Sequence, residues 1–437
     1  MVFFPEISDP IPYEGPKSRN PLSFRHYKAD KMVGDKTMAE HLRFAVCYWH
    51  SFKGTGMDPF GAPTMIRAWE SAHDPMKRAH DTMDAAFEFM CKLGVQLWCF
   101  HDRDIAPEGQ DFAESCKNLD KMVAYAKKKQ TECDIELLWG TANLFSNPRF
   151  QAGAATNPDP HVFAYAAAQV KHALEATQEL GGQGYTFWGG REGYDTLLNT
   201  DMKLERENFA RLLWMAIEHG KRIGWEGQFY IEPKPLEPTK HQYDSDAEAC
   251  LNFLREFGLM EHLKLNLETN HATLAGHSMQ HEMQVARHAG ILGSVDANVG
   301  DTLLGWDTDQ FPTDIYLTTT IMMELLEMCG FTTGGLNFDA KLRRQSHEPV
   351  DLFYAHIGGM DAFARGLEVA YRIRQDGRLS QLLESRYADW EGELGERIRS
   401  GEASLAECEA FVREHGEPVR RSGRQEMLEN LINEYIL

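Results

Sequence analysis

The chain has 437 residues, of which 43% are hydrophobic and 25% are charged, a balance typical of a globular protein with a sizeable core. Its formal net charge of −21 excludes a nucleic-acid-binding surface, because a polyanion would be repelled and the sequence contains no segregated basic stretch. The eight cysteines are scattered without a CxxC pair, and no stretch approaches the roughly 18 apolar residues that span a bilayer.

Residues 1–40 are rich in proline and charge, and we expect them to form an irregular leader packed on the outside. They lack the basic and long apolar regions of a signal peptide, so we expect a cytoplasmic protein that does not bind membranes. Short apolar runs typical of strands then alternate with long amphipathic segments. The expected strands are residues 42–50, 94–104, 134–143, 182–192, 227–235, 263–271, 292–298 and 334–341.

The segments between these runs carry helix signals. Residues 74–93 begin with Asp74 and Pro75, a typical N-cap and first-turn pair, and end before Gly94. Residues 160–180 and 202–223 are bounded in a similar way, by Pro160 at the start of the first and by glycines after both. Each connection between strands is therefore long enough to contain a helix.

Eight parallel strands that are each followed by a helix predict an α/β protein with a (β/α)8 or TIM barrel over residues 41–379. The catalytic face of such a barrel lies at the C-terminal ends of the strands. A doubly wound open sheet is the alternative, but no GxGxxG turn follows the first strand and no P-loop is present.

From about residue 380 the strand signal ends. Residues 380–437 are charged and helical, with apolar positions such as Leu382, Trp390, Phe411 and Leu431. An extension of this length cannot easily bury its apolar residues alone. We therefore expect a C-terminal helical arm that wraps a neighbouring subunit in an oligomer.

Acidic residues recur where the predicted strands end. Six carboxylates meeting at one pocket would repel one another, so they would have to protonate or bind cations, and two divalent ions together with Lys234 would nearly neutralise them. Oxygen donors with a single imidazole suit Mg²⁺, Mn²⁺ or Co²⁺ better than structural Zn²⁺. Taken singly, each acid could instead cap a helix or pair with Arg343 or Arg344. The candidate metal ligands are Glu232, Glu268, His271, Asp296, Asp307, Asp309 and Asp339.

A second group of polar residues lies in the block FHDRD. Asp104 or Asp102 could orient the His101 imidazole, which would make it a base for a substrate hydroxyl. Lys234 lies between two prolines in EPKP and is interpreted as an electrophile for a developing oxyanion. The tryptophans at three strand ends, Trp49, Trp139 and Trp188, are either core residues or the walls of a sugar pocket.

Together these blocks resemble the xylose isomerase family, in its longer class with an extended N-terminus. The matching stretches run in order from residue 48 to residue 346. They are YWHSFKGTGMDPFG, WCFHDRD, LWGTANLF, FWGGREGY, IEPKP, ETNHATLAGH, DANVGD, GWDTDQFPT and NFDAKLRRQS.

The resemblance implies an enzyme that interconverts D-xylose and D-xylulose, and more slowly D-glucose and D-fructose, by ring opening and a metal-assisted 1,2-hydride shift. It implies one cation held by Glu232, Glu268, Asp296 and Asp339, and a second held by Glu268, His271, Asp307 and Asp309. His101, oriented by Asp104, would assist ring opening, and Lys234 would hydrogen-bond the substrate O1. The expected substrate-binding residues are Trp49, Phe60 (from a neighbouring subunit), Trp139, Thr141, Thr186 and Trp188.

The resemblance also implies a homotetramer, although the sequence does not separate a tetramer from a dimer, nor a hydride shift from an enediol route. Thr186, Thr269 and Val299 depart from the family pattern, which has Val, Ala and Arg there. A sugar epimerase, a metal-dependent endonuclease and a non-enzymatic sensor on the same barrel are the competing interpretations. An epimerase needs spare carboxylates, an endonuclease needs a basic groove, and a sensor leaves the intact ligand set without a purpose.

Overall fold

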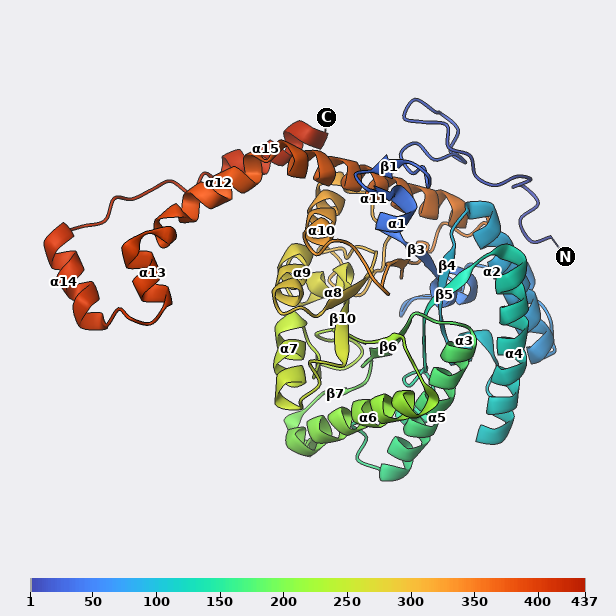
Figure 1. Ribbon diagram of the computed structural model, residues 1–437. Coiled ribbons are helices and arrows are strands. Elements are labelled where there is room, and N and C mark those ends of the chain that lie inside the picture. The colour runs from blue at the N-terminus through green and yellow to red at the C-terminus, as the bar shows by residue number, and fades with distance from the viewer. Residues whose placement is uncertain (1, 437) are drawn as a thin grey trace.

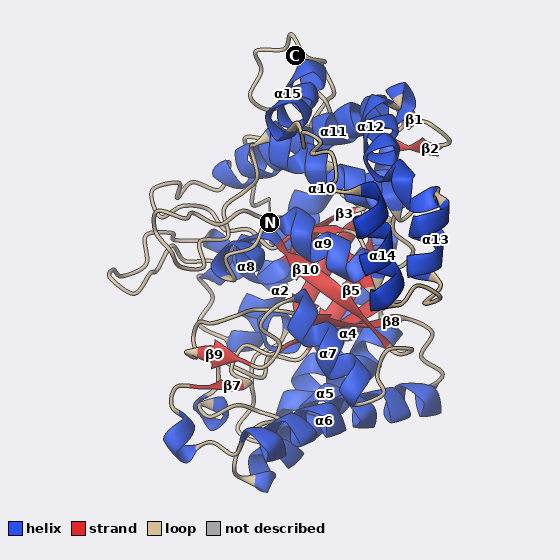
Figure 2. Ribbon diagram, turned by 90° about the vertical axis from the view of Figure 1, so that its left-hand side faces the viewer, coloured by secondary structure: helices blue, strands red, loops and turns tan. Residues whose placement is uncertain are grey.

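A closed barrel of parallel strands forms the centre of the computed structural model, which describes residues 2–436 (Figures 1 and 2). Each strand pairs with the next barrel strand along the chain, and the last pairs with the first. The predicted TIM barrel is therefore confirmed, and the open-sheet alternative is wrong. The barrel strands are β3 (Phe44–Cys47), β4 (Leu97–His101), β5 (Glu136–Thr141), β6 (Gly184–Trp188), β8 (Gln228–Glu232), β10 (Leu263–Glu268), β11 (Leu292–Asp296) and β12 (Leu336–Phe338).

Helices surround the barrel, and their ends follow the local sequence signals. The side chain of Asp74 accepts a hydrogen bond from the Lys77 amide at the start of α2, and Gly94 ends that helix with a φ of 81°. The segment 202–223 forms α6 with the predicted bounds. The outer helices are α2 (Pro75–Leu93), α4 (Phe112–Cys133), α5 (Pro160–Glu179), α6 (Met202–Ile223), α7 (Ala247–Glu256), α9 (Met279–His288), α10 (Ile315–Glu327) and α11 (Asp351–Asp376).

Several strands are shorter than predicted because the chain turns directly into a short helix. A π-helical turn, η1 (Trp49–Lys53), follows β3 after one residue, while α3 (Asp102–Ile105) follows β4 and α8 (Thr269–Leu274) follows β10. Residues 263–271 were predicted to form a strand, whereas the structure ends β10 at Glu268 and places His271 on α8. Such turns hold the residues beyond the strand ends more rigidly than a loop would, and π-helical turns are frequent at functional sites.

The N-terminal leader is mostly irregular apart from β1 (Met32–Val33), β2 (Lys36–Thr37) and α1 (Met38–Leu42). Many of its apolar side chains are nevertheless buried, and the Phe4 ring lies 5.4 Å from the Trp69 and Phe353 rings and 5.7 Å from the Phe89 ring. The leader thus covers the seam between α2 and α11. A second small ribbon, β7 (Gly193–Tyr194) with β9 (His241–Gln242), lies outside the barrel.

The C-terminal segment is helical, as expected, and consists of α12 (Arg378–Tyr387), α13 (Glu393–Arg399), α14 (Leu405–His415) and α15 (Gln425–Ile436). Figure 1 shows α13 and α14 well away from the barrel, whereas α15 returns to α11. Ile432 of α15 is buried with Val369 and Ile373 of α11. Trp390 and Phe411 remain exposed, so this part of the arm has apolar surface that one chain does not cover.

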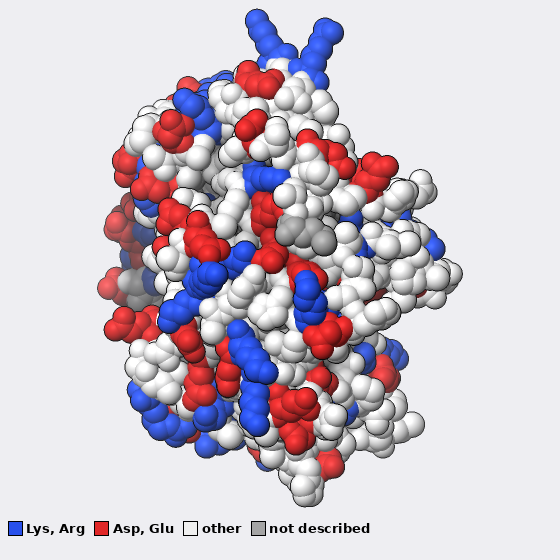
Figure 3. Space-filling model, turned by 90° about the vertical axis from the view of Figure 1, so that its right-hand side faces the viewer, with Lys and Arg blue, Asp and Glu red and all other residues white. Residues whose placement is uncertain are grey.

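Charges of both signs are interspersed on the surface. On the face shown in Figure 3, which carries α2 and α4, Lys and Arg side chains lie among Asp and Glu side chains. One ion pair links these helices, with 2.6 Å between Lys129 Nζ and Asp84 Oδ1. Within residues 2–436, every helix is too short or too polar to cross a membrane.

One buried histidine gives the fold a predictable dependence on pH. His356 of α11 is fully buried, its ring packs on Phe89, Phe311 and Phe338, and burial lowers its pKa from 6.5 to about 4. As the pH falls below 6.5, the unfolded chain takes up a proton that the folded chain excludes. We expect this residue to cost the folded state about 3 kcal/mol when the pH has fallen to about 4.

The variant His356→Leu tests this expectation, because leucine fills a similar volume without titrating. Melting temperatures are measured for both proteins from about pH 7 to about pH 5. The wild type should lose stability relative to the variant as the pH falls. Parallel curves for the two proteins would show that His356 does not contribute to the pH dependence.

Candidate metal centre

The predicted acidic residues converge at the carboxyl end of the barrel. Glu232, Glu268, Asp296 and Asp339 each provide an oxygen, and these four atoms lie within 4.8 Å of one another. The same holds for Glu268 with Asp307 and Asp309, and for donor atoms of Glu232, Glu268 and His271. Glu268 belongs to all three groups, as a residue that bridges two cations would.

The register of the barrel explains this convergence. Glu268, the last residue of β10, is the register partner of Asp296, the last residue of β11. Glu232 ends β8, and Asp339 follows β12 directly. Because the strands are parallel, their last residues lie at the same rim, so acids far apart in sequence become neighbours.

Asparagine side chains hold these carboxylates in place, and the sequence analysis missed them. Asn266 donates to Glu232 Oε2 at 3.0 Å and to Asp296 Oδ2 at 2.7 Å, and Asn298 donates to Glu268 Oε1 at 2.8 Å. Asn266 lies two residues before Glu268, and Asn298 two residues after Asp296. Side chains two apart in a strand point to the same face, so the spacing of Asn266 and Glu268 within β10 was a usable signal, whereas Asn298 lies beyond the end of β11. Asn270 and Asn337 bond further site carboxylates.

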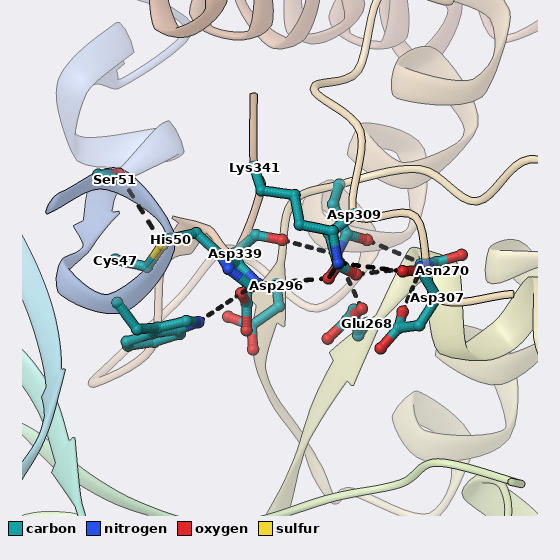
Figure 4. Close-up of polar contacts among 12 residues, drawn as sticks. Cys47, His50, Ser51, Glu268, Asn270, Asp296, Asp307, Asp309, Asp339 and Lys341 are labelled. Carbon is teal, nitrogen blue, oxygen red and sulfur yellow. Dashed lines mark hydrogen bonds and ion pairs between the residues drawn. The ribbon is translucent and has the colours of Figure 1, made fainter. Parts of the chain in front are cut away.

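Basic side chains neutralise one side of the cluster (Figure 4). Lys341 Nζ lies 2.9 Å from Asp309 Oδ2, and His50 Nε2 lies 3.1 Å from Asp339 Oδ1. Lys234 Nζ lies 2.5 Å from Asp307 Oδ2, which places the predicted electrophile at the cluster. His50 and Lys341 were not among the predicted site residues, although both lie just beyond barrel strands.

The pKa values divide the cluster into two parts. Although burial acts in the opposite direction, Lys341 and His50 hold the pKa of Asp309 well below its usual range. Burial, together with the neighbouring carboxylates, raises the pKa of Glu232, Glu268 and Asp296 well above the usual range. Within residues 2–436, the site carboxylates that form no ion pair with a lysine or arginine therefore include Glu232, Glu268 and Asp296, the three with raised pKa values.

This donor set fits divalent cations. The buried Nδ1 atom of His271 has no hydrogen-bond partner within residues 2–436, and the nearest carboxylate oxygen paired with it, Glu232 Oε1, is 3.7 Å away. Several carboxylates with raised pKa values and an unpartnered imidazole nitrogen are what a cation site presents without its ion. The predominance of oxygen donors matches hard cations.

Helix capping and pairing with Arg343 or Arg344, the alternative roles for single acids, are not what the structure shows. Arg343 donates to the side chain of Gln310, and Arg344 donates to the carbonyl oxygens of Gly56 and Ala62. Glu268 precedes α8, but its side chain makes no capping hydrogen bond.

An aromatic cavity of about 190 Å³ opens beside the carboxylates. Its other walls are His101 and the rings of Trp49, Trp139, Phe145 and Trp188, with Thr141 and Thr186. Of these, Phe145 was not predicted. The indole Nε1 of Trp49 also donates to Asp339 Oδ1 at 2.8 Å, so this wall residue orients a candidate ligand as well.

The structure distinguishes between the two aspartates proposed to orient His101. His101 Nδ1 lies 2.7 Å from Asp104 Oδ2, while Asp102 accepts hydrogen bonds from the Asn143 amide and from Gln169. The Nδ1 contact leaves the other ring nitrogen, Nε2, available for a ligand. Phe60, which was predicted to act from a neighbouring subunit, is 81% exposed, lies with its ring centroid 5.5 Å from that of Trp306, and does not line the cavity of its own chain.

The whole chain is similar to proteins named xylose isomerase. It is 55% identical over 437 residues to that of Rhodopirellula baltica, covering 100% of this chain and 99% of the relative. It is 56% identical over 434 residues to that of Thermoanaerobacterium thermosaccharolyticum (99% of both chains) and 56% identical over 437 residues to that of Geobacillus kaustophilus (100% and 98%). Residues 383–436 match the family model described as the XylA2 C-terminal domain.

Solved structures of more distant proteins share the fold. The structure of L-ribulose 3-epimerase has a TM-score of 0.50 and 15% identity, covering 77% of this chain and 97% of that one. A D-psicose 3-epimerase structure has a TM-score of 0.50 and 13% identity, covering 74% and 99%. At such identities the likeness concerns the barrel alone.

Proposed function

The chain belongs to the xylose isomerase family, and from this premise we infer that it is an intramolecular oxidoreductase that interconverts D-xylose and D-xylulose. The observation that carries this inference is the convergence of acids and one imidazole, from four barrel strands and the segments that follow them, beside a cavity with aromatic walls. We propose D-glucose and D-fructose as slower substrates.

We propose that two divalent cations, Mg²⁺, Mn²⁺ or Co²⁺, serve as cofactors. Glu232, Glu268, Asp296 and Asp339 would hold the first; Glu268, His271, Asp307 and Asp309 would hold the second. When bound, the cations supply Lewis-acid polarisation of the sugar oxygens O1 and O2. Two groups of close donor atoms support this assignment, because both contain Glu268. One is Glu232, Glu268, Asp296 and Asp339, and the other is Glu268, Asp307 and Asp309.

The chain's own residues would act on the sugar as follows. His101 Nε2 accepts the proton of the anomeric hydroxyl, and a proton returns to the ring oxygen as the C1–O5 bond opens. Asp104 holds the imidazole in the tautomer that leaves Nε2 free. Lys234 donates to O1 while negative charge develops there. Trp49, Trp139 and Trp188 exclude water from C1 and C2, which favours direct transfer of hydrogen between these carbons.

An assay with D-xylose in D₂O tests the reaction and the route together. With Mg²⁺ or Mn²⁺ we expect D-xylulose to form without solvent deuterium at carbon, and with EDTA we expect no turnover. Deuterium at C1 of the product would indicate an enediol route instead of a hydride shift. Full activity in EDTA would contradict the cation requirement. An epimer of xylose as the product, or no product under any condition, would favour the epimerase or sensor interpretation.

We propose a homotetramer in which the C-terminal arm, residues 380–437, extends from the catalytic barrel, residues 41–379, onto neighbouring subunits. The exposed Trp390 and Phe411 support this, because burial against another subunit would remove their apolar surface from water. Phe60, which is exposed at the rim, would then shield a neighbour's cavity, while the leader, residues 1–40, stays with its own barrel. We further propose a cytoplasmic location, which the free cysteines favour.

Thr186 is proposed to tune the choice between sugars. Its hydroxyl lies in the cavity wall, is buried and has no hydrogen-bond partner within residues 2–436. We expect Thr186→Val to lower kcat/KM for D-glucose relative to D-xylose by roughly two- to tenfold, the worth of one hydrogen bond to the larger sugar. Kinetics with both sugars measure this ratio.

Thr141→Val is the matched control, because the Thr141 hydroxyl already donates to the Thr186 carbonyl oxygen. It should leave the sugar ratio unchanged, whatever it does to the two rates. A Thr186→Val enzyme with the wild-type ratio would exclude Thr186 as a determinant of sugar preference.

A further inference from the structure

A second cluster of possible metal ligands lies between α8 and α9, next to the catalytic centre but separate from its ligands. His277, in the connection between these helices, and His281 and Glu282, in the first turns of α9, each offer a donor atom within 4.8 Å of the other two. Within residues 2–436, the remaining groups with this geometry all contain Glu268. This cluster contains none of the residues assigned to the catalytic centre.

The three side chains are already oriented toward one another. His277 Nδ1 lies 2.5 Å from Glu282 Oε1, and the His277 and His281 rings are 4.9 Å apart between centroids. Glu282 is buried, and its other oxygen, Oε2, accepts a hydrogen bond from the Ala247 amide at 2.7 Å, at the start of α7. His281 is exposed, so an ion could reach the cluster from solution.

We propose that His277, His281 and Glu282 form a third cation site, one that takes a transition-metal ion of the Zn²⁺ class. Two imidazoles and one carboxylate are a donor set that zinc uses in proteins, with water in the fourth position. The same set is poor for Mg²⁺ and Mn²⁺, which prefer oxygen ligands. The donor chemistry therefore distinguishes this site from the oxygen-rich centre around Glu268.

Without a metal, one proton lies between His277 Nδ1 and Glu282 Oε1, and this hydrogen bond by itself satisfies both groups. Binding would replace that proton by the ion. Bonds of about 2.0–2.1 Å in a tetrahedral site place two ligand atoms about 3.3 Å apart, so the pair has to separate by less than about 1 Å. His281 can follow by rotation of its exposed side chain.

Metal binding would link α7, α8 and α9 beside the catalytic centre. Glu282 is bonded to the first residue of α7, and His277 follows Gly276, which has a φ of 78° at the end of the α8 segment. The helix α8 carries His271, a proposed ligand of the catalytic cations. We therefore expect Zn²⁺ at this site to stabilise the fold against unfolding.

Calorimetric titration of the intact, Mg²⁺-saturated protein with Zn²⁺ tests the proposal. The comparison includes His281→Ala and His281→Gln, which change an exposed side chain, and His288→Ala, which removes an exposed histidine from the other end of α9. Zn²⁺ that displaces Mg²⁺ at the catalytic centre contributes equally in all four proteins. The difference between them therefore isolates the new site.

We expect wild type and His288→Ala to bind one Zn²⁺ per subunit that both His281 variants bind at least about tenfold more weakly. The Zn²⁺-induced rise in melting temperature should be correspondingly smaller in the His281 variants. Equal stoichiometry and affinity in all four proteins would overturn the proposal. So would an equal loss in His288→Ala, which would point to non-specific binding by surface histidines.

Discussion

Replacing Glu268 by glutamine should lower kcat for D-xylose by at least about 10³-fold, which corresponds to roughly 4 kcal/mol of lost transition-state stabilisation. Glu268 is the residue shared by every group of donor atoms at the barrel rim. The amide has one neutral oxygen where the carboxylate has two that share a negative charge, so it cannot bridge two cations. The isomerase assay with Mg²⁺ measures the rate, and a Mn²⁺ binding titration should show that at least one ion per subunit is lost.

The matched control is Glu136→Gln, the same chemical change at the first residue of β5, at the opposite end of the barrel. Glu136 is exposed and bonds Gln183, so its substitution should leave kcat and Mn²⁺ binding unchanged. A Glu268→Gln enzyme with wild-type turnover would rule out the bridging role.

The second large effect is expected at His101, and it should depend on whether the substrate forms a ring. His101→Asn removes the base that opens the pyranose, so kcat/KM for D-xylose should fall by roughly 10²- to 10⁴-fold. Glyceraldehyde is too short to close a sugar ring, and its isomerisation to dihydroxyacetone needs no ring opening. The same variant should therefore keep most of its activity on glyceraldehyde.

Asp104→Asn tests the orienting contact of 2.7 Å to His101 Nδ1. It should reduce the rate with D-xylose in the same selective way, but less than the loss of the imidazole does. If His101→Asn lowered the rates for D-xylose and glyceraldehyde equally, His101 would act in the hydrogen transfer or in binding rather than in ring opening.

The barrel and its rim could be predicted from the sequence because both depend on simple periodic rules. Apolar runs of strand length separated by helix-length segments predicted all the barrel strands, and capping residues such as Asp74 located the helix ends. The candidate acids followed from a single topological fact. Residues that end parallel strands share one rim, so Glu232, Glu268 and Asp296 were expected to meet, and they do.

The supporting residues were not predicted, because their contacts depend on side-chain directions at register positions that the sequence does not state. Asn298 reaches Glu268 from just beyond the neighbouring strand β11, and His50 reaches Asp339 from the π-helical turn after β3. The predicted strands extended too far toward their C-terminal ends for a related reason. The sequence shows where apolar alternation stops, but not that the next residues, such as His271, turn at once into a helix.

The arm shows a different limit. Its helical character was clear from composition, but the surface that would cover the exposed Trp390 and Phe411 lies outside what one chain's sequence describes. A pattern within one chain indicates that apolar surface needs cover, without stating which surface covers it.

Anomalous diffraction from crystals grown with Mn²⁺ tests the central claim most directly, because it locates the cations independently of activity. The account predicts two Mn²⁺ peaks per subunit at the barrel rim, both in contact with Glu268. One should be bound by Glu232, Asp296 and Asp339, and the other by His271, Asp307 and Asp309. A single peak, or Mn²⁺ located away from these carboxylates, would contradict it.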